Sequence, residues 1–165
     1  MSSLNPRVVF VSRETEYAAL LAKHSTRGQA EFFLSSRGQK IEDLEARDAL
    51  QSRALTAAKD AVPADWSFTH VMREDLSRFL FSPEDIIVPI GQDGLVANIA
   101  KYLTGQPVIG VSPDQASSEG VLTRHSVDRL PELLKSAAHS DADIQARAMV
   151  EACLLYTSPS PRDRG

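Results

Sequence analysis

The sequence predicts an α/β domain of three layers, in which a mostly parallel sheet carries helices on both faces. Short apolar runs alternate along the chain with segments of helical spacing, which is the pattern of parallel strands joined by helical connections. The chain has 165 residues, 42% of them hydrophobic and 24% charged, which suffices for one domain with a substantial core.

The first half of the chain contains two expected strands. Arg7 to Ser12 reads "RVVFVS", a β-branched and aromatic run typical of a strand. Residues 13–36 have helical spacing, and Gly28 predicts a break because glycine costs a helix about 1 kcal/mol relative to alanine. A close approach of another backbone or a ligand is the alternative reason for this glycine. Residues 40–62 predict a long helix that ends before a proline, and residues 65–72 predict the second strand.

The second half repeats the alternation. After a short helix or turn in residues 73–82, residues 85–91 form an apolar strand, which must end early or bulge at Pro89 because proline lacks a backbone N–H. Residues 95–103 predict a helix, and residues 106–112 predict the next strand.

Three further elements are expected toward the end of the chain. Residues 121–125 predict a short strand, and residues 126–141 predict a helix in which Pro131 must lie near the first turn. Residues 144–152 alternate weakly and predict a last strand.

Composition excludes several function classes. The net charge of -4 and the lack of a Lys/Arg cluster argue against nucleic acid as a partner. No apolar run is long enough for a membrane span or a signal peptide, so we expect no membrane partner and a cytoplasmic location. The single cysteine and the dispersed histidines lack metal-ligand spacing, so we expect no metal site built from side chains.

A glycine-flanked loop is the main candidate for chemistry. The strand at residues 85–91 leads into Gly91, Gln92, Asp93 and Gly94, and a segment of helical spacing follows. In parallel sheets ligands bind at the carboxyl ends of strands, and a strand that passes through glycines into a helix is a common phosphate site. From spacing alone, a tight turn in which Asp93 caps the helix is the first interpretation, and the wider context changes that order.

The wider context of this loop resembles the NAD kinase family. The stretch "IIVPIGQDGLVANIAKYLTGQPVIGVSPD" follows that family's strand, Gly-Gly-Asp-Gly loop, helix and "Pro-Val-Leu-Gly-Ile-Asn" strand in order and approximate spacing. Diacylglycerol kinases and phosphofructokinases of the same superfamily share the loop, and the second strand favours NAD kinase. The likeness covers Asp85 to Leu122. Gln92 replaces the second glycine, Leu95 the threonine and Ser112 the asparagine of the family pattern.

The resemblance implies a reaction and its participants. Asp93 matches the aspartate that takes a proton from the 2′-hydroxyl of NAD while that oxygen attacks the γ-phosphate of ATP. Gly91 and Gly94 would allow the backbone to approach the nucleotide, with amides donating to its oxygens. Mg²⁺ would accompany the phosphates of ATP rather than bind to dedicated protein ligands.

Four other residues are weaker candidates for nucleotide binding. Asn98 could reach back toward the loop, although helix-packing polarity explains it as well. Arg13 follows the first strand and could contact a phosphate, against the default of an exposed arginine at a helix start. Ser112 and Asp114 end the strand at residues 106–112 and could line the same pocket, although "SPD" is also a turn signature.

The family has a second, β-rich domain that supplies an Asn-Glu or Asn-Asp pair and much of its oligomer interface. No such pair occurs in this sequence. We therefore expect residues 1–146 to form the nucleotide-binding α/β domain and residues 147–152 to begin the crossover to a missing domain. The parent protein would be a homo-oligomer, and these residues alone would have little activity.

The last segment differs from the rest. Cys153 to Asp163 matches the translation of a transposon-based library adapter, so we expect residues 153–165 to be a disordered tail of non-native origin. A natural flexible C-terminus is the alternative.

Two other functions remain open from the sequence. One is a related kinase of the superfamily that phosphorylates a lipid or a sugar, with the same Asp93 and glycines. The other is a nucleotide-binding domain without turnover. The differences from the family pattern at Gln92 and Leu95 favour this second function.

Overall fold

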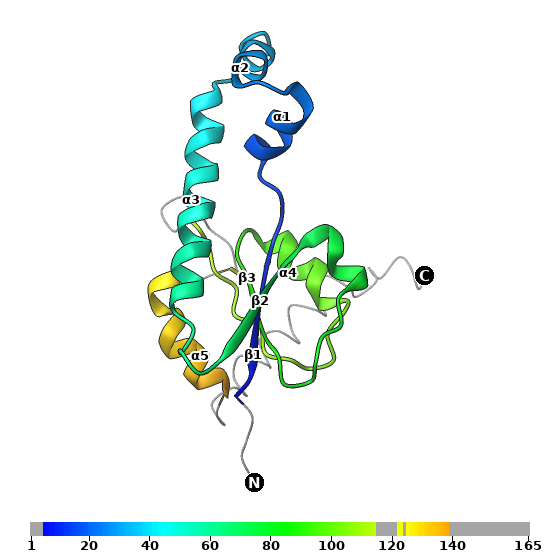
Figure 1. Ribbon diagram of the computed structural model, residues 1–165, viewed down its shortest axis with the longest axis vertical. Helices are drawn as coiled ribbons and strands as arrows, with labels where there is room; N and C mark the ends of the chain where they lie inside the picture. The colour runs from blue at the N-terminus through cyan, green and yellow to red at the C-terminus, as the bar shows by residue number, and fades with distance from the viewer. Residues whose placement is uncertain (1–4, 115–121, 124, 139–165) are drawn as a thin grey trace, which may run out of the picture.

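The computed structural model describes residues 5–114, 122–123 and 125–138, and it has an α/β fold (Figure 1). Three parallel strands form a sheet in the order β2-β1-β3. Their bounds are β1 Arg7–Ser12, β2 Ser67–Met72 and β3 Ile86–Pro89. The three strands expected in the first half and middle of the chain are confirmed, two of them in shorter form.

The strand expected at residues 106–112 occurs only as isolated backbone bridges, and the strand expected at residues 121–125 lies partly outside the described residues. Val108 pairs with Ile87, and Val111 pairs with both Ile90 and His125, all in parallel orientation. Residues 106–112 thus run alongside β3 without a continuous ladder. Pro89 has no N–H to donate, and β3 ends there as expected.

The central strand has no exposed face. Val8 and Phe10 pack into one apolar cluster, while Val9 and Val11 pack into another on the opposite face. A parallel strand covered on both sides needs a continuous apolar run rather than an alternating one. This explains why "RVVFVS" carries so strong a strand signal.

Helices cover both faces of the sheet. The second half of α3 (Ile41–Asp60) and α5 (Leu130–Ala138), which follows the 3-10 helix η2 (Val127–Arg129), pack on the face of Val8 and Phe10. The 3-10 helix η1 (Arg73–Arg78) and α4 (Asp93–Ala100) contribute Leu76, Leu95 and Ile99 to the other face. We call the strands with these covering elements the sheet body.

The chain also forms a helical protrusion beyond the sheet. It consists of α1 (Glu16–His24), α2 (Arg27–Ser35) and the first half of α3, and it stands above the sheet in Figure 1. Its own small cluster contains Ala30, Leu34, Ile41 and Leu44. α3 joins the two parts, because its second half packs on the sheet.

The helix break expected at Gly28 lies elsewhere. α1 ends at His24, Ser25 takes a φ of 69°, and Thr26 caps α2 by accepting a hydrogen bond from the Gln29 amide at 3.2 Å. Gly28 lies in the first turn of α2, where a threonine cap outweighs one glycine. A Cβ added there would meet nothing within 4 Å, so no other backbone approaches Gly28 closely.

Two other boundaries moved. The helix expected at residues 95–103 is α4, which begins at Asp93 and ends at Ala100. Pro131 lies in the first turn of α5, as expected.

The expectations for residues 144–152, for the crossover at 147–152 and for the tail at 153–165 lie outside the described residues. Within the described part of the chain, no helix is long and apolar enough to cross a membrane.

Candidate functional site

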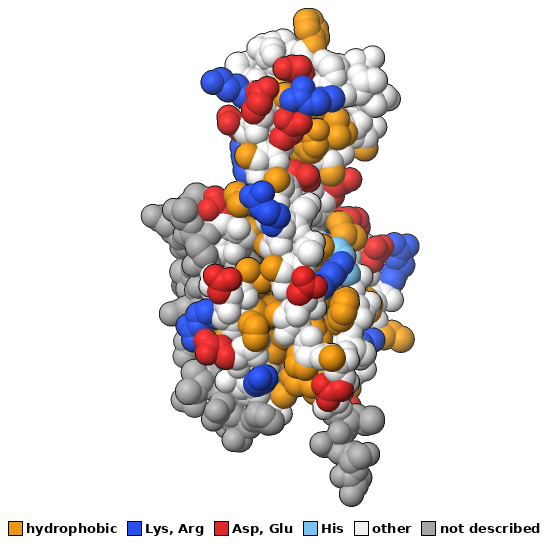
Figure 2. All heavy atoms as spheres, turned by 60° about the vertical axis from the view of Figure 1, so that its left-hand side comes forward, with side chains coloured by type: hydrophobic (Ala, Val, Ile, Leu, Met, Phe, Trp, Pro, Cys, Tyr) orange, Lys and Arg blue, Asp and Glu red, His pale blue; other side chains and the backbone are white. Residues whose placement is uncertain are grey.

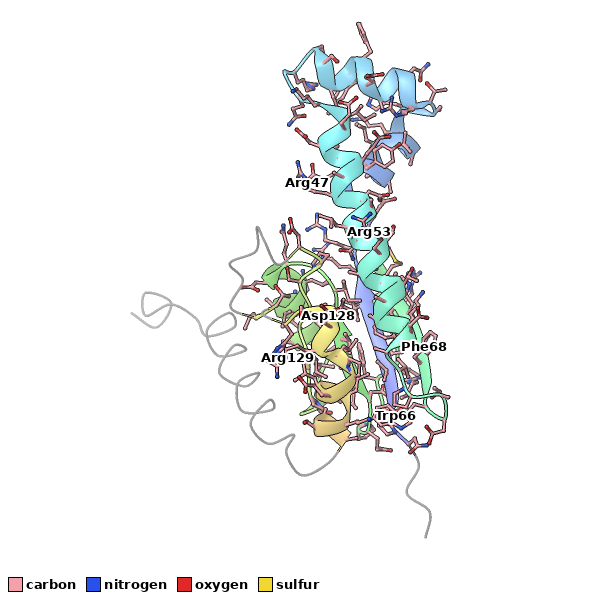
Figure 3. The ribbon with its side chains drawn as sticks, turned by 90° about the vertical axis from the view of Figure 1, so that its left-hand side faces the viewer. Arg47, Arg53, Trp66, Phe68, Asp128 and Arg129 are labelled. Atoms are coloured by element: carbon pink, nitrogen blue, oxygen red, sulfur yellow. The ribbon has the colours of Figure 1, made fainter. Side chains whose placement is uncertain are left out.

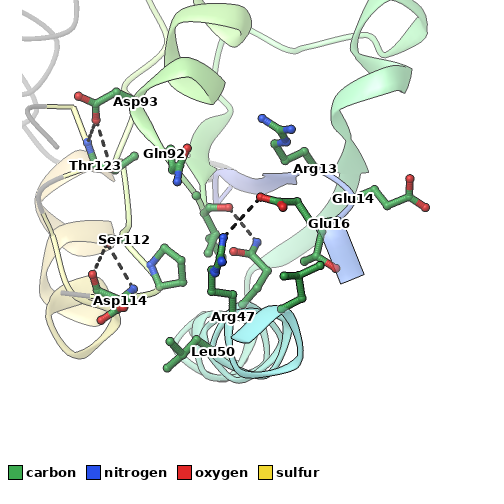
Figure 4. A pocket seen from close by; sticks show the side chains of 16 residues that line it. Arg13, Glu14, Glu16, Arg47, Leu50, Gln92, Asp93, Ser112, Asp114 and Thr123 are labelled. Atoms are coloured by element: carbon green, nitrogen blue, oxygen red, sulfur yellow. Dashed lines mark hydrogen bonds and ion pairs between the residues drawn. The ribbon is translucent and has the colours of Figure 1, made fainter. Parts of the chain in front are cut away.

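A pocket of about 480 Å³ lies at the carboxyl ends of β1 and β3 (Figure 4). From the central strand β1 the chain passes to β2 on one side through α3, and β3 then pairs on the other side and leads into α4. The two connections cover opposite faces of the sheet. Such a reversal opens a crevice between the central strands, and ligands of open α/β sheets bind there.

Five of the seven residues predicted from the sequence line this pocket. They come from three separate segments of the chain: Arg13, Gly91, Asp93, Ser112 and Asp114. The other two, Gly94 and Asn98, lie on α4 and do not belong to the pocket lining. The fold therefore brings together the end of β1, the glycine loop and the end of residues 106–112.

The carboxylate of Asp93 is bound to a distant part of the chain. Its Oδ1 accepts hydrogen bonds from the Leu122 amide at 3.0 Å, the Thr123 amide at 2.9 Å and the Thr123 hydroxyl at 3.1 Å. Asp93 is the first residue of α4, whose N-cap is Gln92. The interpretation of Asp93 as the helix cap is therefore wrong, since its carboxylate instead holds a wall of the pocket.

The same wall is fitted closely to Gly110. A Cβ added at Gly110 would lie 2.1 Å from the carbonyl oxygen of Leu122, which is far inside van der Waals contact. Only glycine allows Leu122 to pass so near. Residues 122–123 are thus held between Gly110 and Asp93.

The two loop glycines leave space rather than adopt a special backbone conformation. Neither Gly91 nor Gly94 has a positive φ. A Cβ at Gly91 would lie 3.3 Å from Leu95 Cδ2, and one at Gly94 would meet nothing within 4 Å. The Gly91 amide donates to the Val111 carbonyl at 3.0 Å, so it is not available to a phosphate as the resemblance implied.

Ser112 and Asp114 combine both roles that the sequence allowed. The Ser112 hydroxyl is paired with the backbone of Asp114, with its oxygen 3.2 Å from the carbonyl oxygen and 3.3 Å from the amide nitrogen. These contacts form a turn, and the turn itself lines the pocket. Ser112 is buried, and its own amide donates to the His125 carbonyl at 2.9 Å.

The opposite wall comes from the first half and the middle of α3 and was not predicted. α3 contributes Leu44, Arg47, Leu50 and Gln51. The Gln51 side-chain amide donates to the Ile90 carbonyl at 2.9 Å, and Arg47 lies 3.5 Å from a carboxylate oxygen of Glu16. One sequence signal for this wall was available. The spacing of three and four residues puts Leu44, Arg47 and Gln51 on one face of the helix, so two polar side chains share a face with an apolar one.

The pocket lining carries charges of both signs. The lining includes two arginines, Arg13 and Arg47, and four carboxylates, Glu14, Glu16, Asp93 and Asp114. The ionisable side chains of the lining thus carry an excess of negative charge. Among the described residues, no group of three His, Cys, Asp or Glu side chains could hold a metal ion by itself.

A smaller hollow of about 240 Å³ lies beside β2 and η1. His70 lines it, and the His70 Nε2 is 2.7 Å from the Ser12 hydroxyl. Burial, with a smaller contribution from nearby Lys59, lowers the pKa of His70 from its ordinary 6.5. The His70 imidazole thus provides a hydrogen-bond partner for the buried Ser12 hydroxyl and connects β1 to β2.

Comparisons with known proteins do not assign a family. The chain matches no protein-family model and no curated protein.

Proposed function

We propose that the pocket binds a nucleotide and that the parent protein is an NAD kinase-like phosphotransferase. The observation that carries this proposal is the convergence of Arg13, Gly91, Asp93, Ser112 and Asp114 on one pocket at the carboxyl edge of the sheet. Its volume of about 480 Å³ is in the range of small-molecule sites, which is roughly 300–1,000 Å³.

The reaction needs an acceptor hydroxyl, a phosphate donor and a base. The 2′-oxygen of NAD attacks the γ-phosphorus of ATP, the bond to the bridging oxygen breaks, and ADP leaves. The hydroxyl proton passes to the carboxylate of Asp93. Three hydrogen bonds to its Oδ1 hold that carboxylate in the pocket wall, and a fixed base supports the proposal because phosphoryl transfer depends on the positioning of its groups.

A second function has an observation in its favour. The bonds from Leu122 and Thr123 give Asp93 a structural role that needs no turnover. A nucleotide-binding domain without catalysis would keep this aspartate for the same reason. A lipid or sugar kinase would share the base and differ only in the acceptor.

Nucleotide binding is tested first on the purified chain. We expect Mg-ATP to raise its thermal stability, by about 2.7 kcal/mol at a ligand concentration one hundred times Kd. NAD should do the same independently. If neither nucleotide shifts the unfolding temperature at millimolar concentration, the proposal is wrong.

Asp93 variants in the full-length parent separate catalysis from binding. Asp93→Asn keeps an oxygen that accepts from residues 122–123 but cannot take a proton, whereas Asp93→Ala removes both functions. We expect the Asp93→Asn variant to retain ATP binding and to lose phosphorylation of NAD. The panel of acceptors also contains diacylglycerol and sugars. Full turnover in the Asn variant would remove Asp93 as the base, and turnover with another acceptor would replace NAD.

A further inference from the structure

The walls of the pocket differ in charge. Arg13 and Arg47 lie on the side formed by the end of β1 and α3, while Asp93 and Asp114 lie on the side formed by the loops (Figure 4). Glu16 is next to Arg47, and Glu14 is directed away from the other labelled side chains in Figure 4. A ligand with a phosphate end and a hydroxyl end therefore meets two chemically different walls.

We propose that Arg47 and Arg13 bind the phosphate chain of the ligand and that the contact of Arg47 with Glu16 is a resting pair that phosphate displaces. This inference rests on the proposed function and deepens it, since it assigns the phosphate end to the protrusion side of the pocket. It adds a residue of the helical protrusion, Arg47, to the binding site.

The resting pair is weak enough to be displaced. Arg47 Nη1 and Glu16 Oε1 are 3.5 Å apart, and the two side chains are 64% and 70% exposed. Exposed ion pairs of this kind contribute little stability. A phosphate carries more charge than a carboxylate and matches the planar guanidinium with two parallel hydrogen bonds, so it competes well for Arg47.

Arg13 supplies the second cation. It is exposed, lines the pocket, and takes part in no hydrogen bond or ion pair within the described part of the chain. Two guanidinium groups on one wall bind a phosphate chain more firmly than either one alone.

The loop wall suits the other end of the ligand. Asp93 and Asp114 carry negative charge, which repels a phosphate and accepts hydrogen bonds from hydroxyl groups. Hydrogen bonds within the wall fix both residues in place. A divalent cation that accompanies the phosphates would be attracted to the same carboxylates.

The test uses Mg²⁺ tripolyphosphate, which has the phosphate chain without a base or ribose. Its Kd for the purified chain is measured by calorimetry. We expect Arg47→Ala and Arg13→Ala each to weaken binding by roughly tenfold or more, the usual loss for a hydrogen bond to a charged group. Arg47→Lys should fall in between, because lysine keeps the charge without the fork.

Arg53→Ala is the matched control. Arg53 is an exposed arginine on the same helix, six residues from Arg47, and does not line the pocket (Figure 3). Six residues turn a helix by about 240°, so the two side chains leave it in different directions. Arg53→Ala removes the same charge, and its Kd for tripolyphosphate should be close to that of the wild type. Its thermal stability without tripolyphosphate should be close to that of Arg47→Ala.

Glu16→Gln tests the resting pair. Removal of the Glu16 charge should tighten tripolyphosphate binding by a few fold in the wild type and have no effect in an Arg47→Ala background. An equal gain in both backgrounds means that Glu16 acts only through the general field, and the resting pair is then overturned.

Failure of this inference differs from failure of the proposed function. Absence of tripolyphosphate binding, or an Arg47→Ala loss no larger than that of Arg53→Ala, overturns the inference. ATP and NAD can still stabilise the chain in that case, which leaves the proposed function standing. Conversely, arginine-dependent tripolyphosphate binding without any effect of ATP or NAD supports the phosphate wall and refutes the nucleotide proposal.

Discussion

The sheet body and the helical protrusion are held together by different kinds of interaction. In the body, Val8, Val9, Phe10 and Val11 are completely buried on the two faces of β1. In the protrusion, α1 has no buried residue. The protrusion combines one small apolar cluster with polar contacts, and Figure 2 shows side chains of both charges lying side by side on its surface.

The polar contacts of the protrusion centre on Glu45. Arg27 donates two hydrogen bonds to its carboxylate, both at 2.8 Å, and the Tyr17 hydroxyl donates a third at 3.0 Å. Arg27 thereby joins α2 to α3, and Tyr17 joins α1 to α3. Directional contacts of this kind set the orientation of helices, whereas the apolar core of the body supplies most of the free energy of folding.

The pocket takes one wall from each region. The body contributes the glycine loop and Asp93, fixed by long-range backbone contacts, and the protrusion contributes Arg47 and Glu16, which are exposed. We expect the body wall to stay constant on ligand binding and the protrusion wall to adjust. Three experiments can break or sharpen this contrast.

The largest effect should come from a core truncation in the body. Ile87 is fully buried between the sheet and α4, and Ile87→Ala should lower the free energy of unfolding by about 3 kcal/mol. Leu34 in the protrusion is 3% exposed, and Leu34→Ala should cost about 2 kcal/mol, because its cluster is small and can collapse around the cavity. Urea unfolding followed by circular dichroism measures both changes.

The similar burial of the two side chains makes this pair a fair comparison. The losses in unfolding free energy should differ because the two side chains pack in different clusters, and not because their exposure differs. A larger loss for Leu34→Ala than for Ile87→Ala would show that the protrusion carries as much of the apolar stability as the body.

The next effect concerns the wall that Asp93 holds. Gly110→Ala places a methyl group against the Leu122 carbonyl and should lower the free energy of unfolding by about 2 kcal/mol, with loss of the nucleotide-dependent gain in stability. Gly94→Ala is the control, since its site is open and helical, and it should raise stability by about 0.5–1 kcal/mol. Thermal unfolding with and without Mg-ATP measures both. Equal behaviour of the two variants would mean that residues 122–123 are not fixed.

The strands and the position of the pocket could be predicted from the sequence. Strand runs such as Arg7–Ser12 were predictable because a parallel strand covered on both faces needs consecutive apolar residues. The pocket position was also predictable, because the end of each strand in a parallel sheet lies at one edge. This placed Arg13, Asp93 and Ser112 together before any contact was known.

The unpredicted features depend on contacts between segments far apart in the chain. Asp93 binds Thr123 across 30 residues, and no local pattern marks that pairing. Arg47 enters the pocket only because α3 runs from the protrusion down onto the sheet. The break near Ser25 was missed because a threonine cap decided it, and glycine was the more visible signal.

The smallest effect should be a pH dependence that belongs to the protrusion alone. Hydrogen bonds from Arg27 hold the pKa of Glu45 at about 2, below its ordinary 4.5. A carboxylate with a lowered pKa in the folded state stabilises the fold fully above pH 4.5, and this contribution is lost as the pH falls toward 2.

Glu45→Gln should therefore reduce stability at neutral pH, and its difference from the wild type should shrink between pH 4.5 and pH 2. The change is small because the Glu45 side chain is 33% exposed and solvent screens its charge. Glu42→Gln removes a carboxylate 3.8 Å from the same arginine and serves as the control. Urea unfolding across this pH range measures all three proteins. If Glu45→Gln and Glu42→Gln follow the same pH profile, the bidentate contact does not orient the helices, and the protrusion is held by its apolar cluster, as the body is.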